Sequence, residues 1–164
     1  MKPTFDHVLV ATDFSDASSA AIDYAAILAA SLGARLHLVH VLEQPFMTSG
    51  HYQWSLPDTP ARREQRYRKA CARLLRDAAG VGDVVAASTE VRGGDVTPSI
   101  AQAAMDYGAG VIVLGTRGHR GFRHLFAGDS VDRLQRLARC PILTVWEPDA
   151  VRSARAPASP QLAA

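Results

Sequence analysis

Residues 110–146 read GVIVLGTRGHRGFRHLFAGDSVDRLQRLARCPILTVW, and this stretch decides the fold of the chain. Residues 111–114 (VIVL) form a short apolar run rich in β-branched side chains, which predicts a strand buried on both faces. A glycine-rich loop follows, and residues 142–146 (ILTVW) predict a second strand after Cys140 and Pro141. Between the loop and that strand, apolar residues recur at helical steps of three and four: Val131, Leu134, Leu137 and Ala138.

A strand, a glycine loop, a helix and a strand in this order are typical of phosphate-binding units in parallel α/β sheets. Loop glycines let backbone N–H groups approach an anion, and the helix N-terminus adds a partial positive charge. Three arginines in the loop either contact phosphate groups or only keep the loop soluble. The glycines are Gly115, Gly118, Gly121 and Gly128, and the arginines are Arg117, Arg120 and Arg123.

The rest of the chain alternates strand and helix patterns. Strands are predicted over residues 5–11, 34–42 and 84–91. Helices are predicted from Ser15 or Asp16 to a stop at Gly33, over residues 61–79, and from an N-cap at Thr97 with Pro98 in the first position to Tyr107. Five strands that alternate with four helices predict an α/β fold, an open, doubly wound, five-stranded parallel sheet. The predicted strand order is 3-2-1-4-5, with the ligand at the switch point between the first strand and the strand over 111–114.

The helix patterns also predict which side chains face the sheet. The first helix points Ile22, Ala25, Ala26, Ala29 and Leu32 inward, and the helix over 61–79 points Tyr67, Cys71, Leu74 and Ala78 inward. The outer face of the second of these helices is basic, and a solvated surface is favoured over an anionic partner because no nucleic-acid motif accompanies it. His37 and His40 lie three apart in one strand, so they face opposite sides of the sheet and cannot share a metal.

Length and composition limit the function further. We expect one domain over residues 1–147, with a long loop at 43–60, and a disordered tail over 148–164. In the loop, His51, Tyr52 and Trp54 either cover a ligand or pack on a helix. The net charge of +2 does not indicate nucleic acid as a partner. Cys71 and Cys140 are predicted to be buried, reduced thiols, and neither a signal sequence nor a membrane-spanning run is apparent, so we expect a cytoplasmic protein without membrane contact.

The glycine spacing resembles that of the universal stress protein family. Gly115 and Gly118 are separated by two residues, Gly118 and Gly128 by nine, and Cys140 falls at the family distance beyond the last glycine. In that family the loop ends in Gly-Ser or Gly-Thr, whereas here Asp129 follows Gly128 and Ser130 comes one position later. The resemblance covers residues 5–146 and implies the strand order given above, an adenine nucleotide alpha hydrolase-like fold, and ATP or another adenine nucleotide as the ligand.

The resemblance also implies a set of binding residues and a dimer. Asp13 and Val41, which follow or end the first two strands, would line the adenine and ribose pocket. Asp13 also has a structural interpretation, as a turn or cap carboxylate at a strand end. Family members pair their final strands, and the apolar run over 142–146 at a sheet edge favours such a homodimer. The implied binding residues are Ala11, Thr12, Asp13, Val41, Gly115, Arg117, Gly118, Gly128, Asp129 and Ser130.

Asp129 is the residue in this set that opposes a phosphate. At a helix start it is a suitable N-cap, and Asp132 three residues later resembles a capping box. Beside a phosphate, however, two negative charges about 4 Å apart repel by about 4 kcal/mol at an effective dielectric constant near 20. Weak ATP binding, ATP binding through Mg²⁺ and a preference for a less charged adenine nucleotide therefore all remain open.

Enzyme motifs are missing from the sequence. It contains no G-x-S-x-G elbow, no phosphate-binding G-x-x-x-x-G-K-[ST] loop and no metal-ligand spacing of Cys and His, so we expect a protein that is not an enzyme. The leading hypothesis is a homodimeric, nucleotide-binding stress regulator without fast turnover, whose protein partner the sequence does not identify. The alternative is a family member that does not bind ATP and acts as a dimeric interaction module. A slow nucleotide hydrolase would need a water-activating base, which the sequence does not identify.

Overall fold

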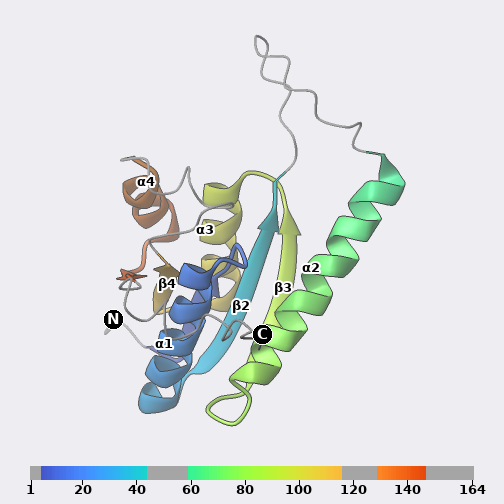
Figure 1. Ribbon diagram of the computed structural model, residues 1–164. Coiled ribbons are helices and arrows are strands. Elements are labelled where there is room, and N and C mark those ends of the chain that lie inside the picture. The colour runs from blue at the N-terminus through green and yellow to red at the C-terminus, as the bar shows by residue number, and fades with distance from the viewer. Residues whose placement is uncertain (1–4, 44–58, 116–128, 147–164) are drawn as a thin grey trace, which may run out of the picture.

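The computed structural model describes residues 5–43, 59–115 and 129–146. They form a five-stranded parallel sheet in the order β3-β2-β1-β4-β5, so the predicted fold class and strand order are confirmed (Figure 1). The elements in chain order are β1 (His7–Ala11), α1 (Asp16–Leu32), β2 (Arg35–Leu42), α2 (Pro60–Gly80), β3 (Ala87–Gly93), α3 (Val96–Tyr107), β4 (Val111–Gly115), α4 (Asp129–Ala138) and β5 (Ile142–Val145).

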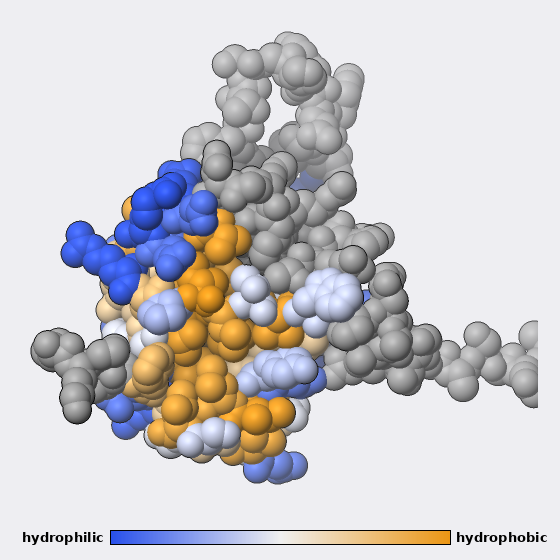
Figure 2. Space-filling model, turned by 90° about the vertical axis from the view of Figure 1, so that its left-hand side faces the viewer, coloured by the Kyte–Doolittle hydropathy of each residue, from blue (hydrophilic) through white to orange (hydrophobic). Residues whose placement is uncertain are grey.

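The edge strand β5 leaves part of its apolar surface exposed. It pairs with β4 on one side, and within the described residues no strand pairs with its other side. Leu143 is 40% exposed and Trp146, just after the strand, is 54% exposed. Figure 2 looks at this side of the molecule and shows hydrophobic residues gathered on its surface. Such an edge is prone to association unless another surface covers it.

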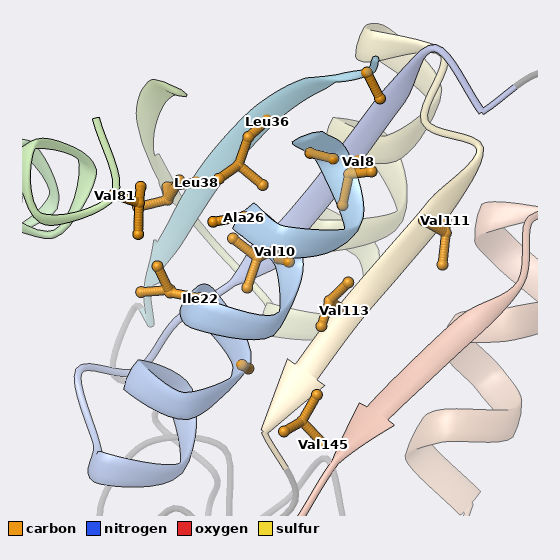
Figure 3. Packing of buried hydrophobic residues seen from close by; sticks show 14 of the residues in the cluster. Val8, Val10, Ile22, Ala26, Leu36, Leu38, Val81, Val111, Val113 and Val145 are labelled. Carbon is orange, nitrogen blue, oxygen red and sulfur yellow. The ribbon is translucent and has the colours of Figure 1, made fainter. Parts of the chain in front are cut away.

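Each face of the sheet carries its own hydrophobic core. Val8, Val10 and Val113 point to the face covered by α1 and α2, whereas Leu9 and Ile112 point to the face covered by α3 and α4. The alternation follows from the two-residue period of strand side chains. Small residues on α1 let this helix lie close to the sheet beneath it (Figure 3). The buried alanines of α1 are Ala17, Ala21, Ala25, Ala26 and Ala29.

Two predicted inward residues, Leu32 and Tyr67, are instead exposed, and so is Leu137 of the apolar pattern that predicted α4. Leu32 at the end of α1 is 47% exposed, Tyr67 in α2 is 48% exposed and Leu137 in α4 is 40% exposed. In α2 the buried residues are Ala70 and Leu74, one turn apart, so this long helix touches the sheet along a narrow stripe. The predicted stripe for α2 was too wide because helical spacing alone does not tell how much of a helix the sheet covers.

Two predicted boundaries and the burial of the cysteines also need correction. The strand predicted over 84–91 begins at Ala87, because Val84 and Val85 donate their backbone N–H groups to the Val81 carbonyl in a turn after α2. The N-cap of α3 is Asp95 and not Thr97, which is buried, and Pro98 lies in the first turn, where a missing N–H breaks no intrahelical bond. The two cysteines are free thiols but only half-buried, and this burial raises the pKa of Cys140.

Gly115, at the end of β4, is a residue that the packing requires. A Cβ atom at this position would overlap the backbone of Ala17 and Ser18 in the first turn of α1. The end of β4 and the start of α1 therefore approach each other closer than any side chain allows. This contact fixes the corner where β1, α1 and β4 meet.

We expect Gly115→Ala to destabilise the protein by about 2 kcal/mol or more, because relieving the overlap must shift the backbone of β4 or α1. Gly80→Ala is the matched control, since a Cβ at Gly80, the last residue of α2, meets nothing within 4 Å. Urea unfolding followed by circular dichroism gives both free energies of unfolding. Equal stabilities of the two variants would contradict the close approach.

Candidate functional site

The carboxyl ends of β1, β2 and β4 meet at one edge of the sheet, at the predicted switch point. Ala11 lies opposite Leu114 in β4 and Val39 in β2, and the Thr12 N–H donates to the Val39 carbonyl at 2.9 Å. The structure therefore brings together five of the predicted binding residues: Ala11, Thr12, Asp13, Val41 and Gly115.

The other five predicted residues lie at or beyond the limits of what the structure describes. Arg117, Gly118 and Gly128 are outside the described residues. Asp129 and Ser130 are the first two residues of α4.

Asp13 is held by a cluster of serines at the start of α1. Its Oδ1 accepts hydrogen bonds from the Ser15 backbone N–H at 3.0 Å, from the Ser15 hydroxyl at 2.5 Å and from the Ser18 hydroxyl. Ser15 is also the N-cap of α1 and accepts from the Ser18 N–H at 3.2 Å. The structural interpretation of Asp13 as a turn carboxylate is therefore correct, and the same bonds fix its orientation at the switch point. Of the two caps that the sequence predicted, Ser15 is confirmed, but the contacts of Ser15 and Ser18 with Asp13 were not predicted, although Asp-x-Ser is a known turn signal.

Phe14, the next residue, has a left-handed backbone with φ of 63°. A bulky side chain in this region costs free energy of about 1–3 kcal/mol, and such residues are concentrated at functional sites. The Phe14 N–H donates to the Thr12 hydroxyl at 3.0 Å, and Thr12 is fully buried. The turn after β1 is thus a strained segment that is held in place by buried polar contacts.

His40 joins this turn to β2. Its Nδ1 lies 2.7 Å from the Thr12 carbonyl oxygen, which can only accept, so Nδ1 carries the hydrogen. Burial lowers the pKa of His40, against smaller opposing effects from this hydrogen bond and from Asp13, and keeps the ring neutral. The His40 ring also packs on Phe14, with centroids 4.2 Å apart.

His37 behaves as the strand period predicted. It faces the side of the sheet opposite to His40, where it lies 2.9 Å from a ring nitrogen of His7 and stacks on Tyr107. In the described ranges, no group of three or more His, Cys, Asp or Glu side chains is placed to hold a metal ion. None of the helices in the described part of the chain is long and apolar enough to span a membrane.

This geometry agrees with a family comparison. The family model of the universal stress proteins matches residues 4–145 of this chain. The chain belongs to this family. Universal stress protein A homolog 1 of Coxiella burnetii is 30% identical over 142 residues, which cover 87% of this chain and 96% of that protein.

Solved structures of universal stress proteins have the same fold. A family member from Burkholderia pseudomallei is 31% identical, with a TM-score of 0.64 over 87% of this chain and 96% of that one. Two more distant members were solved with a nucleotide: one in complex with cAMP (18% identity, TM-score 0.61, 87% and 97% covered) and one from Archaeoglobus fulgidus in complex with dAMP (19% identity, TM-score 0.58, 86% and 98% covered).

We expect the ring of His40 in this universal stress protein to remain neutral below its ordinary pKa of about 6.5, as the Nδ1–H tautomer. Nitrogen-15 NMR of the imidazoles distinguishes the tautomers and follows the titration, with the His40→Gln variant identifying the signal. As the pH falls, His40 binds a proton in the unfolded chain before it does so in the folded protein. The contribution of His40 to stability is therefore complete above pH 6.5 and is lost as the pH falls from there through the lowered pKa. An Nε2–H tautomer, or a pKa at or above 6.5, would contradict this assignment.

Proposed function

We propose that this universal stress protein is a homodimeric regulator that binds an adenine nucleotide, ATP in the first place, without fast turnover. The observation that carries the proposal is the meeting of Asp13, Val41 and Gly115 at the switch point of the sheet. Parallel α/β sheets bind ligands in this crevice. The two distant family members solved with cAMP and dAMP support the class of ligand.

The proposed site has two parts. Asp13 and Val41 would bind the adenosine part of the nucleotide. The phosphates would lie at Gly115, at Arg117, Gly118 and Gly128, and at the start of α4, where backbone N–H groups and the helix dipole favour an anion. Asp129 adds a carboxylate to that helix start, so a divalent cation such as Mg²⁺ would bridge it to the phosphates.

Asp129→Ser should raise the affinity for ATP by about tenfold or more, because even 1.4 kcal/mol of relieved repulsion has that effect. The gain should be smaller for AMP, and Mg²⁺ should help the wild-type protein more than the variant. Isothermal titration calorimetry of both proteins with ATP and AMP, with and without Mg²⁺, measures these three effects. Gly118→Val is the loss-of-binding control, since a branched side chain would block the approach of a phosphate to the loop backbone.

The alternative is a family member that does not bind ATP and acts only as a dimeric interaction module. Asp129 is the specific feature that favours it, because its charge opposes a phosphate. Mass spectrometry of the gently denatured recombinant protein would detect co-purified ATP, ADP or AMP. If no nucleotide is found, and if wild type and Asp129→Ser both fail to bind ATP, then the interaction module is the better description.

The homodimer is proposed from the exposed apolar surface along β5. A shallow cavity of about 390 Å³ beside this strand is lined by apolar side chains. Pairing of β5 with its copy would cover the open edge and this surface together. The cavity is lined by Phe5, Leu28, Leu32, Val111, Pro141, Ile142 and Leu143.

Light scattering coupled to size-exclusion chromatography should report a dimer at micromolar concentration. Leu143→Lys and Trp146→Lys should each shift the protein toward the monomer, because each places a charge in the proposed interface. Leu75→Lys is the matched control, since Leu75 is 61% exposed on α2, away from β5. A monomeric wild type, or an equal shift in the control, would contradict a dimer through the last strand.

The proposal also covers turnover and compartment. No catalytic group is assigned, and we expect ATP to leave the site unhydrolysed on the timescale of a regulator. Free, half-buried Cys71 and Cys140 fit a reducing compartment such as the cytoplasm. The site does not identify the protein partner that would recognise the nucleotide-bound form.

A further inference from the structure

Helix α2 carries a row of basic side chains that the proposed nucleotide site does not use. Their positions follow steps of four and three, which place them along one face of the helix. At 1.5 Å per residue the row is about 21 Å long. Its members are Arg62, Arg66, Lys69, Arg73 and Arg76.

Four of these side chains border a groove between α2 and the turn after β1. The groove has a volume of about 430 Å³, within the range of sites that bind small molecules. Its opposite side is formed by Phe14 of the turn and by His40 and Leu42 of β2, and Ala70 and Ala72 complete it from α2. The basic side chains at its border are Arg66, Lys69, Arg73 and Arg76.

The described lining of the groove carries basic side chains but no acidic one. Within the described chain, Lys69, Arg73 and Arg76 form no ion pair with a carboxylate within 4.0 Å. Asp77 follows Arg76 on this helix. Burial has the largest effect on its pKa and raises it, although Arg73 and Arg76 act to lower it. Clustered like charges repel one another, and an anion between them would relieve this repulsion.

Neutral contacts hold two of the guanidinium groups at the groove. Arg66 donates to the Glu43 carbonyl at 2.8 Å, and Arg73 donates to the Phe14 carbonyl at 3.3 Å. The Arg73 guanidinium also lies 5.3 Å from the centre of the Phe14 ring. These bonds help to position the two guanidinium groups at the groove.

The opposite side of the groove is apolar and fixed. Phe14 is locked by its left-handed backbone and its bond to Thr12, and the His40 ring packs against it. Because burial keeps His40 neutral, this ring adds flat surface and no charge. A ligand that fits must therefore combine a multiply charged anionic group with an apolar body.

We propose that this groove binds a small organic phosphate, whose phosphate group contacts Arg66, Lys69, Arg73 and Arg76 and whose apolar body lies on Phe14, His40 and Leu42. Arginine forks favour phosphate, with its two negative charges, over a single carboxylate. The groove adjoins the proposed nucleotide site at the turn after β1, where Asp13 precedes Phe14, but its cationic side chains come from α2, which the nucleotide site does not use. His40 and Val41 are neighbours in β2, and their side chains point to opposite faces of the sheet. The proposal does not rest on nucleotide binding.

Calorimetry of the full chain with octyl phosphate, below its micelle concentration, tests the groove. We expect binding that is at least tenfold tighter than that of inorganic phosphate, because only the ester covers the apolar side. Lys69→Gln/Arg76→Gln should weaken it at least tenfold. Arg62→Gln/Arg68→Gln is the matched control, with the same loss of charge from exposed positions of α2 outside the groove, and should change the affinity less than twofold.

Three results would overturn the proposal. They are an absence of octyl phosphate binding at millimolar concentration, an equal loss of affinity in the two double variants, and complete displacement of octyl phosphate by saturating ATP. Gly118→Val separates this proposal from nucleotide binding, since it should abolish ATP binding and leave octyl phosphate binding unchanged. Circular dichroism and the unfolding midpoint establish that each double variant is folded.

Discussion

The contact between Gly115 and the first turn of α1 is the constraint on which the rest of the structure depends. It brings the end of β4 against the Ala17 carbonyl, and this is possible only without a side chain at Gly115. The buried alanines of α1 extend the same close approach along the sheet. The serine cluster around Asp13 then fixes where α1 begins. A glycine, a row of alanines and a cap therefore define one rigid corner between β1 and β4.

The turn after β1 connects two regions of different chemistry. On its β4 side lies Gly115, the last residue of β4, from which the predicted glycine loop continues in the sequence. On its β2 side lies the groove of α2, where cationic side chains surround an apolar surface. Thr12 is common to both, because it continues β1 and also holds Phe14 and His40 through hydrogen bonds. A strained backbone at Phe14 is tolerated because buried neighbours on both sides hold it.

The sequence predicted the sheet well because the central strands β1, β2 and β4 are mostly buried runs of branched residues, and the strand order follows from the glycine loop and the connection rules. Helix faces were less predictable. Tyr67 has the right spacing to face the sheet, yet α2 rests on Ala70 and Leu74, because its depth depends on β2 and β3 beneath it. At the site, Asp13 could be placed at the switch point from its position after a strand. The contact of Ser18 with Asp13 and that of His40 with Thr12 depend on the turn geometry, so sequence spacing did not reveal them.

Helix α2 buries a smaller share of its residues than α1 or α3 does. It spans 21 residues and buries only two of them, whereas α1 buries seven of its 17. Its contacts with the β1 turn run through Arg73, at the Phe14 carbonyl and above the Phe14 ring, so a charged side chain replaces hydrophobic packing there. Any ligand that binds between α2 and this turn would favour the folded arrangement in proportion to its own binding free energy. The position of α2 would then respond to ligand concentration, while the corner at Gly115 would not, since its packing is complete without a ligand.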